Sequence, residues 1–412
     1  MPQQIPYILM LGCFDTKGEV FSFLRDCLIE QGQRVVTINT GILGTTELFP
    51  IYIESDLVAM EGGHPLKYLR EKRDRGFAVD IMGKGIAKVI SFLMAQGGVK
   101  AAISMGGGGG TYIALSAMRE IPIGIPKLCL STLATKDLSQ QVGSKDIVLM
   151  PSVVDVAGLN SISKGLIRQA AAAICAMSDF PAGNEEKRSG RIAISMFGNT
   201  TACVDECTSL MKSMGYEVFA FHANGTGGRT MEALIREGCF DGALDITTTE
   251  LADDLCGGIC SSGPERLDAA IENNIPLVVV PGCLDMVNFG PMNSVPTKYK
   301  DRILYSWAPD VTLMRTDKQE NVLLAEKIAS KLNNAISPVT ILLPLKGLSQ
   351  IDSEGELFYY PEINQALFNT IKGNIMPHIK IVEVDLHIND PEFSKMAVSC
   401  LLEMLGKVNT GK

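Results

Sequence analysis

The residues best suited to bind a ligand follow directly on an apolar segment near the start of the chain. That segment, residues 6–12, leads into "GCFDTKGE", where Asp15, Thr16 and Lys17 precede a helical pattern. A helix N-terminus offers free N–H groups and a partial positive charge, both of which favour a phosphate. Thr16 could donate its hydroxyl and Lys17 its charge, whereas Asp15 could hold Mg²⁺, bind a ribose hydroxyl or cap the helix. The segment therefore predicts a phosphate-binding loop.

Five consecutive glycines follow a second apolar segment, residues 100–105. The run is Gly106, Gly107, Gly108, Gly109 and Gly110, and Thr111 and a helical pattern come next. Glycine loses much conformational entropy on folding, and a simple turn needs only one or two. Successive N–H groups of such a run can form an anion-binding nest. Because the run lies between a strand and a helix, we interpret it as a ligand-binding loop rather than a flexible linker.

Two further segments of the first half could complete the same site. "LCLSTLATKD" supplies Ser131 and Thr132 after another apolar run, and "MPSVVDVAGLN" places Asp155 shortly before a long helical pattern. Asp155 could reach a neighbouring loop or could simply be a turn residue. Ligands of open parallel sheets bind at the carboxyl ends of the strands, so we expect these loops to lie together.

The corresponding loops of the second half are rich in hydroxyls and carboxylates instead of glycine. The candidates for a cleft there are Thr247, Thr248, Thr249, Asp285 and Asn288. Asp285, His222 and His387 are the candidate catalytic residues. His387 lies among carboxylates and could serve acid–base or metal chemistry, or ordinary surface and cap chemistry. Only four histidines occur and none form a close pair, so an obligatory zinc site is not expected.

The absence of two common nucleotide-binding motifs disfavours two classes of protein. No G-x-x-x-x-G-K-[ST] occurs, and no G-x-G-x-x-G opens the helix after the first strand, so a P-loop NTPase and a nicotinamide cofactor are disfavoured. The basic run "KYLREKRDRG" (67–76) is interpreted as a solvated helix face, and the alternative is that it borders an anionic ligand or a partner.

The elements that must position these residues are apolar strands alternating with amphipathic helices. Expected strands are 6–12, 34–39, 100–105, 127–131, 192–197, 216–221, 242–246, 276–280, 339–343 and 379–384. Expected helices include 19–31, 86–97, 161–177, 202–214, 228–237, 264–273 and 319–333. Runs that are apolar on both faces and separated by helices predict parallel sheets covered on both sides.

This pattern occurs twice. Residues 7–41 align with 191–225, "GGVKAAISMGGGGGT" with "EGCFDGALDITTTEL", and "IPKLCLSTLA" with "IPLVVVPGCL". The first copy has about 40 extra residues, roughly 46–85. We therefore predict an α/β protein of two Rossmann-like, doubly wound parallel-sheet subdomains that arose by internal duplication. The expected N-terminal subdomain is 1–180 and the C-terminal one is 190–412, with a polar seam at 178–190.

Composition sets the class of protein. The 412 residues carry a net charge of −9 with 46% hydrophobic residues, which excludes disorder as the main state and disfavours nucleic acid as a partner. No apolar run approaches the ~18 residues of a membrane span, and no signal peptide is evident at the N-terminus. The eleven cysteines are scattered without a C-x-x-C pair, so we expect reduced thiols and a cytoplasmic protein.

Seven motifs together resemble the Tm-1-like ATP-binding family, also called UPF0261. They are "GCFDTKGEV", "SMGGGGGT", "DITTTELADDL", "PGCLDMVNFGP", "VTLMRTDKQEN", "LLPLKGLSQID" and "EVDLHINDPEF", in the family's order and spread over about 2–407. The resemblance implies two Rossmann-like subdomains, ATP binding by the N-terminal one, and frequent dimerisation. It also implies that the nucleotide site includes Asp15, Thr16, Lys17, the glycines 106–110 and Thr111, which match the family's strand-end loops. It implies nothing settled about a reaction.

Residues and resemblance together lead to one expectation and two alternatives. We expect ATP, with Mg²⁺ held by Asp15 or Asp155, to place its phosphates between the "DTKG" and glycine loops. Its adenosine would lie along the Ser131/Thr132 edge of the sheet. One alternative is an enzyme whose second-half residues bind a small anionic substrate in an interdomain cleft. The other is a homodimeric interaction protein regulated by nucleotide. Whether ATP is hydrolysed is left open by the sequence.

Overall fold

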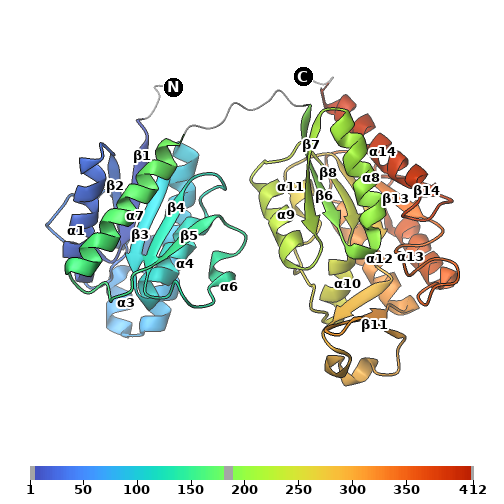
Figure 1. Cartoon of the computed structure of the whole chain (residues 1–412), viewed down its shortest axis with the longest axis horizontal. Helices are drawn as coiled ribbons and strands as arrows, with labels where there is room; N and C mark the ends of the chain where they lie inside the picture. Colours follow the sequence, from blue (N-terminus) through green and yellow to red (C-terminus); the bar gives the residue numbers. More distant parts are fainter. Residues whose placement is uncertain (1–4, 181–188, 410–412) are drawn as a thin grey trace. The chain divides into compact units, whose positions relative to one another are not determined.

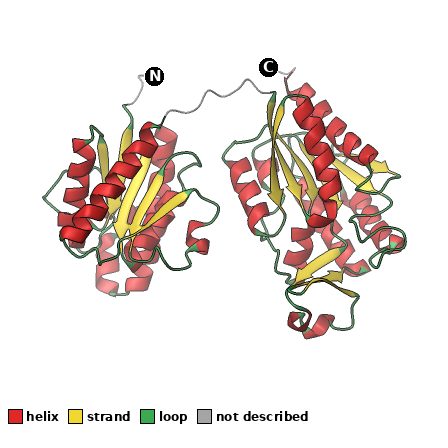
Figure 2. Cartoon of the chain, viewed as in Figure 1, coloured by secondary structure: helices red, strands yellow, loops and turns green. Residues whose placement is uncertain are grey.

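A computed structural model describes residues 5–180 and 189–409, and the chain divides into two compact units, Met1–Glu185 and Glu186–Lys412 (Figure 1). Most of the expected seam, residues 181–188, lies outside the described part. Each unit has its own buried cores, and strands form a layer between helices in each (Figure 2). The α/β prediction is confirmed for both units.

The first unit contains a five-stranded parallel sheet in the order β2-β1-β3-β4-β5. The strands are β1 (Tyr7–Gly12), β2 (Val35–Asn39), β3 (Val99–Gly106), β4 (Lys127–Ser131) and β5 (Ile147–Pro151). The helices are α1 (Phe14–Glu30), α2 (Ser55–Glu61), α3 (Leu66–Lys72), α4 (Arg75–Gln96), α5 (Gly108–Arg119), α6 (Ser139–Val142) and α7 (Ser161–Asp179). Helices α1 and α7 bury apolar residues on one face of the sheet, and α2, α4 and α5 do so on the other. β1 is therefore buried along its whole length.

The second unit contains a six-stranded parallel sheet in the order β14-β13-β9-β8-β6-β7. The strands are β6 (Gly190–Met196), β7 (Tyr216–His222), β8 (Gly242–Thr247), β9 (Leu277–Gly282), β13 (Val339–Pro344) and β14 (Lys380–Val384). The helices are α8 (Thr201–Ser213), α9 (Thr226–Arg236), α10 (Thr249–Cys256), α11 (Ala269–Glu272), α12 (Lys318–Leu332), α13 (Pro361–Asn374) and α14 (Pro391–Asn409). Short 3₁₀ turns are η1 (Gly198–Thr200), η2 (Met292–Ser294) and η3 (Thr297–Tyr299).

The two sheets share one strand order. If β1, β2, β3 and β4 are matched to β6, β7, β8 and β9, both sheets read second, first, third, fourth. The matched strands are the ones that the sequence alignment pairs. Between β2 and β3 the first unit inserts α2 and α3 before its crossover helix, whereas α9 alone connects β7 to β8. The extra residues of the first copy therefore include α2, α3 and the start of α4, which pack on one face of a shared scaffold.

Several elements differ from the sequence prediction. A small antiparallel sheet, β10-β12-β11, was not expected, and neither was β5. The strands of the small antiparallel sheet are β10 (Met286–Phe289), β11 (Leu304–Ala308) and β12 (Val311–Arg315). The helix expected at 264–273 is reduced to α11, because Leu267 has a left-handed φ of 76° and Arg266 turns into the core. No helix in the described ranges is long and apolar enough to cross a membrane.

Candidate functional site

A polar cavity of about 410 Å³ lies at the carboxyl ends of β1 and β3 in the first unit. The chain leaves β1 toward β2 on one side and later enters β3 on the other, so the strand order reverses between these two strands. Crevices at such reversals are the usual ligand sites of open α/β sheets. The cavity is lined by Cys13, Thr16, Lys17, Arg75, Met105, Gly106, Gly107, Gly108, Gly109, Gly110, Thr132 and Asp155.

The five glycines form a helix N-terminus rather than a loop. Gly106 ends β3, Gly107 is the N-cap of α5, and Gly108 begins the helix. None of the five has a positive φ, so the expected anion nest, which alternates right- and left-handed residues, is not formed. Helix geometry leaves the first N–H groups without intrahelical partners, and no side chain caps those of α5. The feature of this segment that is suited to an anion is therefore the start of α5, not a nest.

Packing explains some of these glycines but not all of them. A Cβ on Gly106 would lie 3.0 Å from the backbone of Gly110, and one on Gly109 would lie 3.1 Å from Val79. A Cβ on Gly108 would meet no atom within 4 Å, although Gly is a poor helix former. No neighbouring atom of the protein therefore requires glycine at position 108. The close approach of a ligand to the backbone would be a reason for glycine there.

Lys17 lies across the cavity and joins two of its walls. Its backbone (φ −131°, ψ 22°) interrupts α1 after the first turn. Its ammonium donates a hydrogen bond of 2.5 Å to the carbonyl of Val156, in the segment that follows β5. This contact holds Asp155, the neighbour of Val156, beside the cavity. An ammonium has three donors, so Lys17 keeps capacity for an anion.

Arg75 is a lining residue that the sequence reasoning did not select, although it lies in the basic run. It is the first residue of α4, and Asp74 caps that helix by accepting a hydrogen bond of 3.0 Å from the N–H of Phe77. Its guanidinium is exposed and makes no ion pair with any described residue. The cavity therefore has two cationic side chains, Lys17 and Arg75, beside the start of α5.

Three of the expected ligand residues do not line this cavity. Asp15 accepts hydrogen bonds from the N–H groups of Thr16 (2.7 Å) and Leu43 (2.8 Å), so both of its oxygens hold backbone. The hydroxyls of Thr111 and Ser131 lie 2.7 Å apart, and each residue is only 1% exposed. These two residues fasten the start of α5 to the end of β4, which corrects their expected role as ligand donors. Thr132 and Asp155 do reach the cavity.

An apolar pocket of about 570 Å³ adjoins the glycine cavity. The two share Cys13, Thr16, Arg75, Gly109 and Gly110. Its walls include the buried side chains of Leu69, Met82 and Ile113. It lies on the α3 and α4 side of the glycine cavity, not along the Ser131 and Thr132 edge. The first unit therefore offers a polar compartment and an apolar one that communicate.

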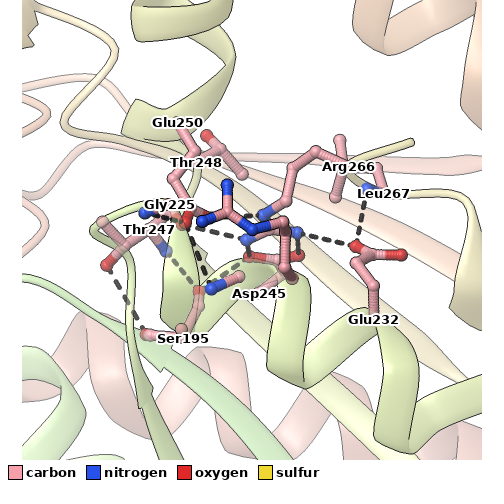
Figure 3. Close-up of polar contacts among 12 residues, drawn as sticks. Ser195, Gly225, Glu232, Asp245, Thr247, Thr248, Glu250, Arg266 and Leu267 are labelled. Atoms are coloured by element: carbon pink, nitrogen blue, oxygen red, sulfur yellow. Dashed lines mark hydrogen bonds and ion pairs between the residues drawn. The ribbon is translucent and has the colours of Figure 1, made fainter. Parts of the chain in front are cut away.

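The matching strand ends of the second unit are filled by the unit's own side chains (Figure 3). Arg266 is 1% exposed and binds Asp245 through two hydrogen bonds, of 2.5 and 2.6 Å. It also binds Glu250 at 2.7 Å and Glu232 at 3.1 Å. Burial raises the pKa of Glu232, although Arg266 and two backbone N–H groups oppose that rise. A buried arginine thus neutralises carboxylates that sequence reasoning had not linked.

The second-unit threonines belong to the same buried region. Thr247, Thr248 and Thr249 have no exposed surface. The hydroxyl of Thr247 pairs with that of Thr200 at 2.7 Å, that of Thr248 donates to a backbone carbonyl at 3.2 Å, and that of Thr249 accepts from Asn288 at 3.3 Å. The expectation that they bind substrate is corrected, because these hydroxyls make the unit's internal hydrogen bonds.

Asp285 is buried in a cluster at the end of β9 rather than displayed in a cleft. Its Oδ2 accepts a hydrogen bond of 2.7 Å from Ser349, while its Oδ1 and the Oδ1 of Asp352 have no hydrogen-bond donor. Arg315 is the nearby cation, 3.8 Å from Asp352. Burial, with the charge of Asp352 added, raises the pKa of Asp285 to about 7. Asp285 therefore has no access to a substrate in this structure.

The two candidate histidines also lack a catalytic arrangement. The Nε2 of His387 lies 2.9 Å from the carbonyl of Ser349, and its Nδ1 accepts from the N–H of Asn389 at 3.1 Å. Both ring nitrogens of His387 are thus hydrogen-bonded to backbone groups. His222 is exposed and stacks on Phe197 with ring centroids 5.3 Å apart. In the described ranges, no group of three or more metal-ligating His, Cys, Asp or Glu side chains occurs.

Fold and site together define a class: a protein of two Rossmann-like parallel α/β units, the first with a polar cavity at its strand reversal. Comparison with known proteins gives the family. The chain matches "Uncharacterised protein family (UPF0261) N-terminal domain" over residues 6–182 and the corresponding C-terminal domain over residues 189–405. The chain belongs to the UPF0261 family.

Its relatives include bacterial and plant proteins. A UPF0261 protein of Clostridium tetani is 44% identical over 97% of this chain and 99% of its own length. The ToMV susceptible protein tm-1 of Solanum lycopersicum is 40% identical over 98% of this chain but only 56% of its own length. Among solved structures, a protein from O. sativa in complex with UDP is 10% identical to this chain. Its TM-score of 0.23 is too low to support any inference about this chain.

Proposed function

We propose that the first unit binds ATP, with the phosphates at the start of α5. The observation that carries the proposal is Gly108, an open helical glycine at the N-terminus of α5, in a cavity lined by Lys17 and Arg75. Free N–H groups, a helix dipole and two cations together favour a polyanion.

The adjoining apolar pocket suggests a place for the base. Leu69, Met82 and Ile113 offer a surface against which a flat ring can pack, next to the shared residues Gly109 and Gly110. This placement replaces the Ser131/Thr132 edge that the sequence suggested.

Asp155 is the residue that would hold Mg²⁺ if the metal accompanies ATP. It is exposed and lines the glycine cavity, whereas the oxygens of Asp15 are already hydrogen-bonded. Mg²⁺ is usually held by one or two carboxylates together with substrate phosphates, so one carboxylate is a fitting donor set. The cation would offset phosphate charge, while α5, Lys17 and Arg75 orient the phosphates.

Calorimetric titration of the full chain with ATP and Mg²⁺ tests the proposal. We expect saturable binding, and we expect Gly108→Val to abolish it because the side chain would fill the space in front of the N–H groups. Gly165→Val is the matched control, since Gly165 is also an exposed helical glycine with no atom near its Cβ position. Arg75→Met should weaken binding by about tenfold or more.

The outcomes are distinct. Loss of binding in Gly108→Val alone, with the unfolding midpoint retained, supports the site. Equal affinity in Gly108→Val and the unaltered chain would refute the assignment to α5. No heat with millimolar ATP would refute nucleotide binding itself.

A further inference from the structure

A third cavity, of about 620 Å³, lies at the other end of the first unit's sheet. It is formed at the amino ends of β1 and β2, where Tyr7 and Val35 begin the two strands, and along the outer edge of β2. It shares no lining residue with the glycine cavity or its apolar neighbour. Any ligand of this cavity is therefore independent of the ATP proposal.

The cavity is cationic. Arg25 of α1 and Arg34, which precedes β2, both line it, and its lining includes no carboxylate. Neither guanidinium forms an ion pair or a hydrogen bond with a described residue. Two uncompensated arginines on one concavity attract an anion, and the planar fork of each suits a carboxylate or phosphate.

Three aromatic side chains belong to the walls of the cavity, together with aliphatic ones. Tyr52 is 70% exposed and Phe92 is 64% exposed, although both line the cavity, and Tyr7 forms a further part of its wall. The charges of Arg34 and Tyr52 act in opposite directions on the pKa of Tyr7, which burial raises, so these three polar groups lie near one another. Neither tyrosine hydroxyl has a hydrogen-bond partner among the described residues. Exposed aromatic side chains around convergent polar groups are typical of a ligand site.

The wall that carries Tyr52 is held in place before any ligand arrives. The N–H of Tyr52 donates to the carbonyl of Thr37 in β2 at 3.0 Å, and the hydroxyl of Thr37 donates to the carbonyl of Pro50 at 2.7 Å. Ile53 also donates to Thr37, at 3.1 Å. Segment 50–53 is thus fastened to the edge strand, which lowers the entropy cost of binding at this surface.

We propose that this cavity binds a small aromatic anion, with its acidic group at Arg25 and Arg34 and its ring against Tyr52 and Phe92. The shared chemistry is a planar ring that carries one carboxylate or one phosphate.

Three probes of one shape test the proposal on the full chain: 1-naphthoate, 1-naphthyl phosphate and the neutral 1-naphthamide. We expect saturable binding of at least one anion and at least about tenfold weaker binding of the amide, because the amide lacks the charge that the arginines recognise. Arg25→Met with Arg34→Met should remove this preference, and Phe92→Ala should weaken both the acids and the amide.

Matched controls make the result specific. Arg119→Met, in the last turn of α5 and outside this cavity, should leave the affinity unchanged. Comparison of the carboxylate with the phosphate identifies which acidic group is preferred. Equal affinity for the amide would overturn the anionic assignment, and unchanged binding in the double arginine variant would overturn the location. No binding of either anion at millimolar concentration would overturn the proposal altogether.

Discussion

At the scale of single residues, burial decides which polar side chains are available to a ligand. Thr132 and Ser131 are neighbours, yet Ser131 is 1% exposed and pairs with Thr111, while Thr132 is exposed at the cavity. The sequence selected both because hydroxyls after a strand look alike. Adjacent residues of a strand end point to opposite sides, and a single sequence does not reveal which side is open.

Asp285 supports a prediction about pH. Its pKa is raised to about 7 from the ~3.9 of an exposed aspartate, so the folded unit binds this proton more tightly than the unfolded chain does. The proton stabilises the folded unit below about pH 4, and the stabilisation is lost as pH rises toward 7. We expect Asp285→Asn, which is neutral at every pH, to gain stability relative to the unaltered chain between pH 5 and pH 8, by on the order of a few kcal/mol.

The measurement is denaturant unfolding followed by tryptophan fluorescence. Trp307, in β11, is the single tryptophan of the chain and lies in the same unit as Asp285. A stability difference that stays constant from pH 5 to pH 8 would show that Asp285 does not carry the extra proton.

At the scale of elements, the strands buried on both faces carried the clearest sequence signal. β1, β8, β9 and β13 are buried at every position, and their apolar runs are correspondingly clear. β11 is half exposed and five residues long, so it carries no comparable signal. The start of α4 was placed eleven residues late, at 86 instead of 75, because three glycines, Gly76, Gly83 and Gly85, weaken the helical signal of its first turns.

The positions of the end of α9 and the starts of α10 and α11 are set by contacts of Arg266 and its neighbours, and no sequence pattern indicated this residue. Arginine is almost never fully buried unless it is paired, and the motif "GPERLD", in the helix expected at 264–273, contains no sign that Arg266 is buried. In the structure its partners are Glu232 in α9, Asp245 in β8 and Glu250 in α10. Three consecutive elements thus meet at one guanidinium that the following segment supplies, and only the tertiary structure shows this contact.

We expect Arg266→Met to destabilise the second unit severely. Removing the guanidinium leaves three carboxylates buried without their cation, and breaking a buried pair in this way costs about 3–5 kcal/mol. Unfolding monitored through Trp307 should show a much lower midpoint. Lys346→Met, which removes a lysine paired at the surface with Asp385, is the control and should change the midpoint little. Equal midpoints for the two variants would contradict the role given to Arg266.

At the scale of the whole molecule, the duplication predicted from aligned segments is matched by a shared strand order in two units. The alignment did not reveal that the corresponding strand ends differ in whether they are open or filled by side chains. The first unit has an open cavity beside Gly108, and the second has buried threonines beside Arg266. The scaffold was therefore predictable from repeated apolar runs, whereas the state of each strand end depends on long-range side-chain packing.

The two units give a prediction about ligand-induced stability. Each has its own hydrophobic cores, so we expect unfolding transitions that can be assigned to one unit. ATP with Mg²⁺ should raise the midpoint of the transition detected by circular dichroism for the first unit and leave that of Trp307 fluorescence unchanged. At a hundredfold excess over the Kd the shift corresponds to about 2.7 kcal/mol. A shift in the Trp307 transition alone would place the nucleotide in the second unit.

The guanidinium of Arg266 has one more consequence, which appears during purification. A cation that belongs to the chain is present in equal amount with its carboxylates at any dilution, and no washing step can remove it. A bound small molecule has no such guarantee, because its occupancy falls with its free concentration. Exhaustive dialysis should therefore leave the second unit as it was in the cell, while the first unit emerges with whatever it had bound stripped away.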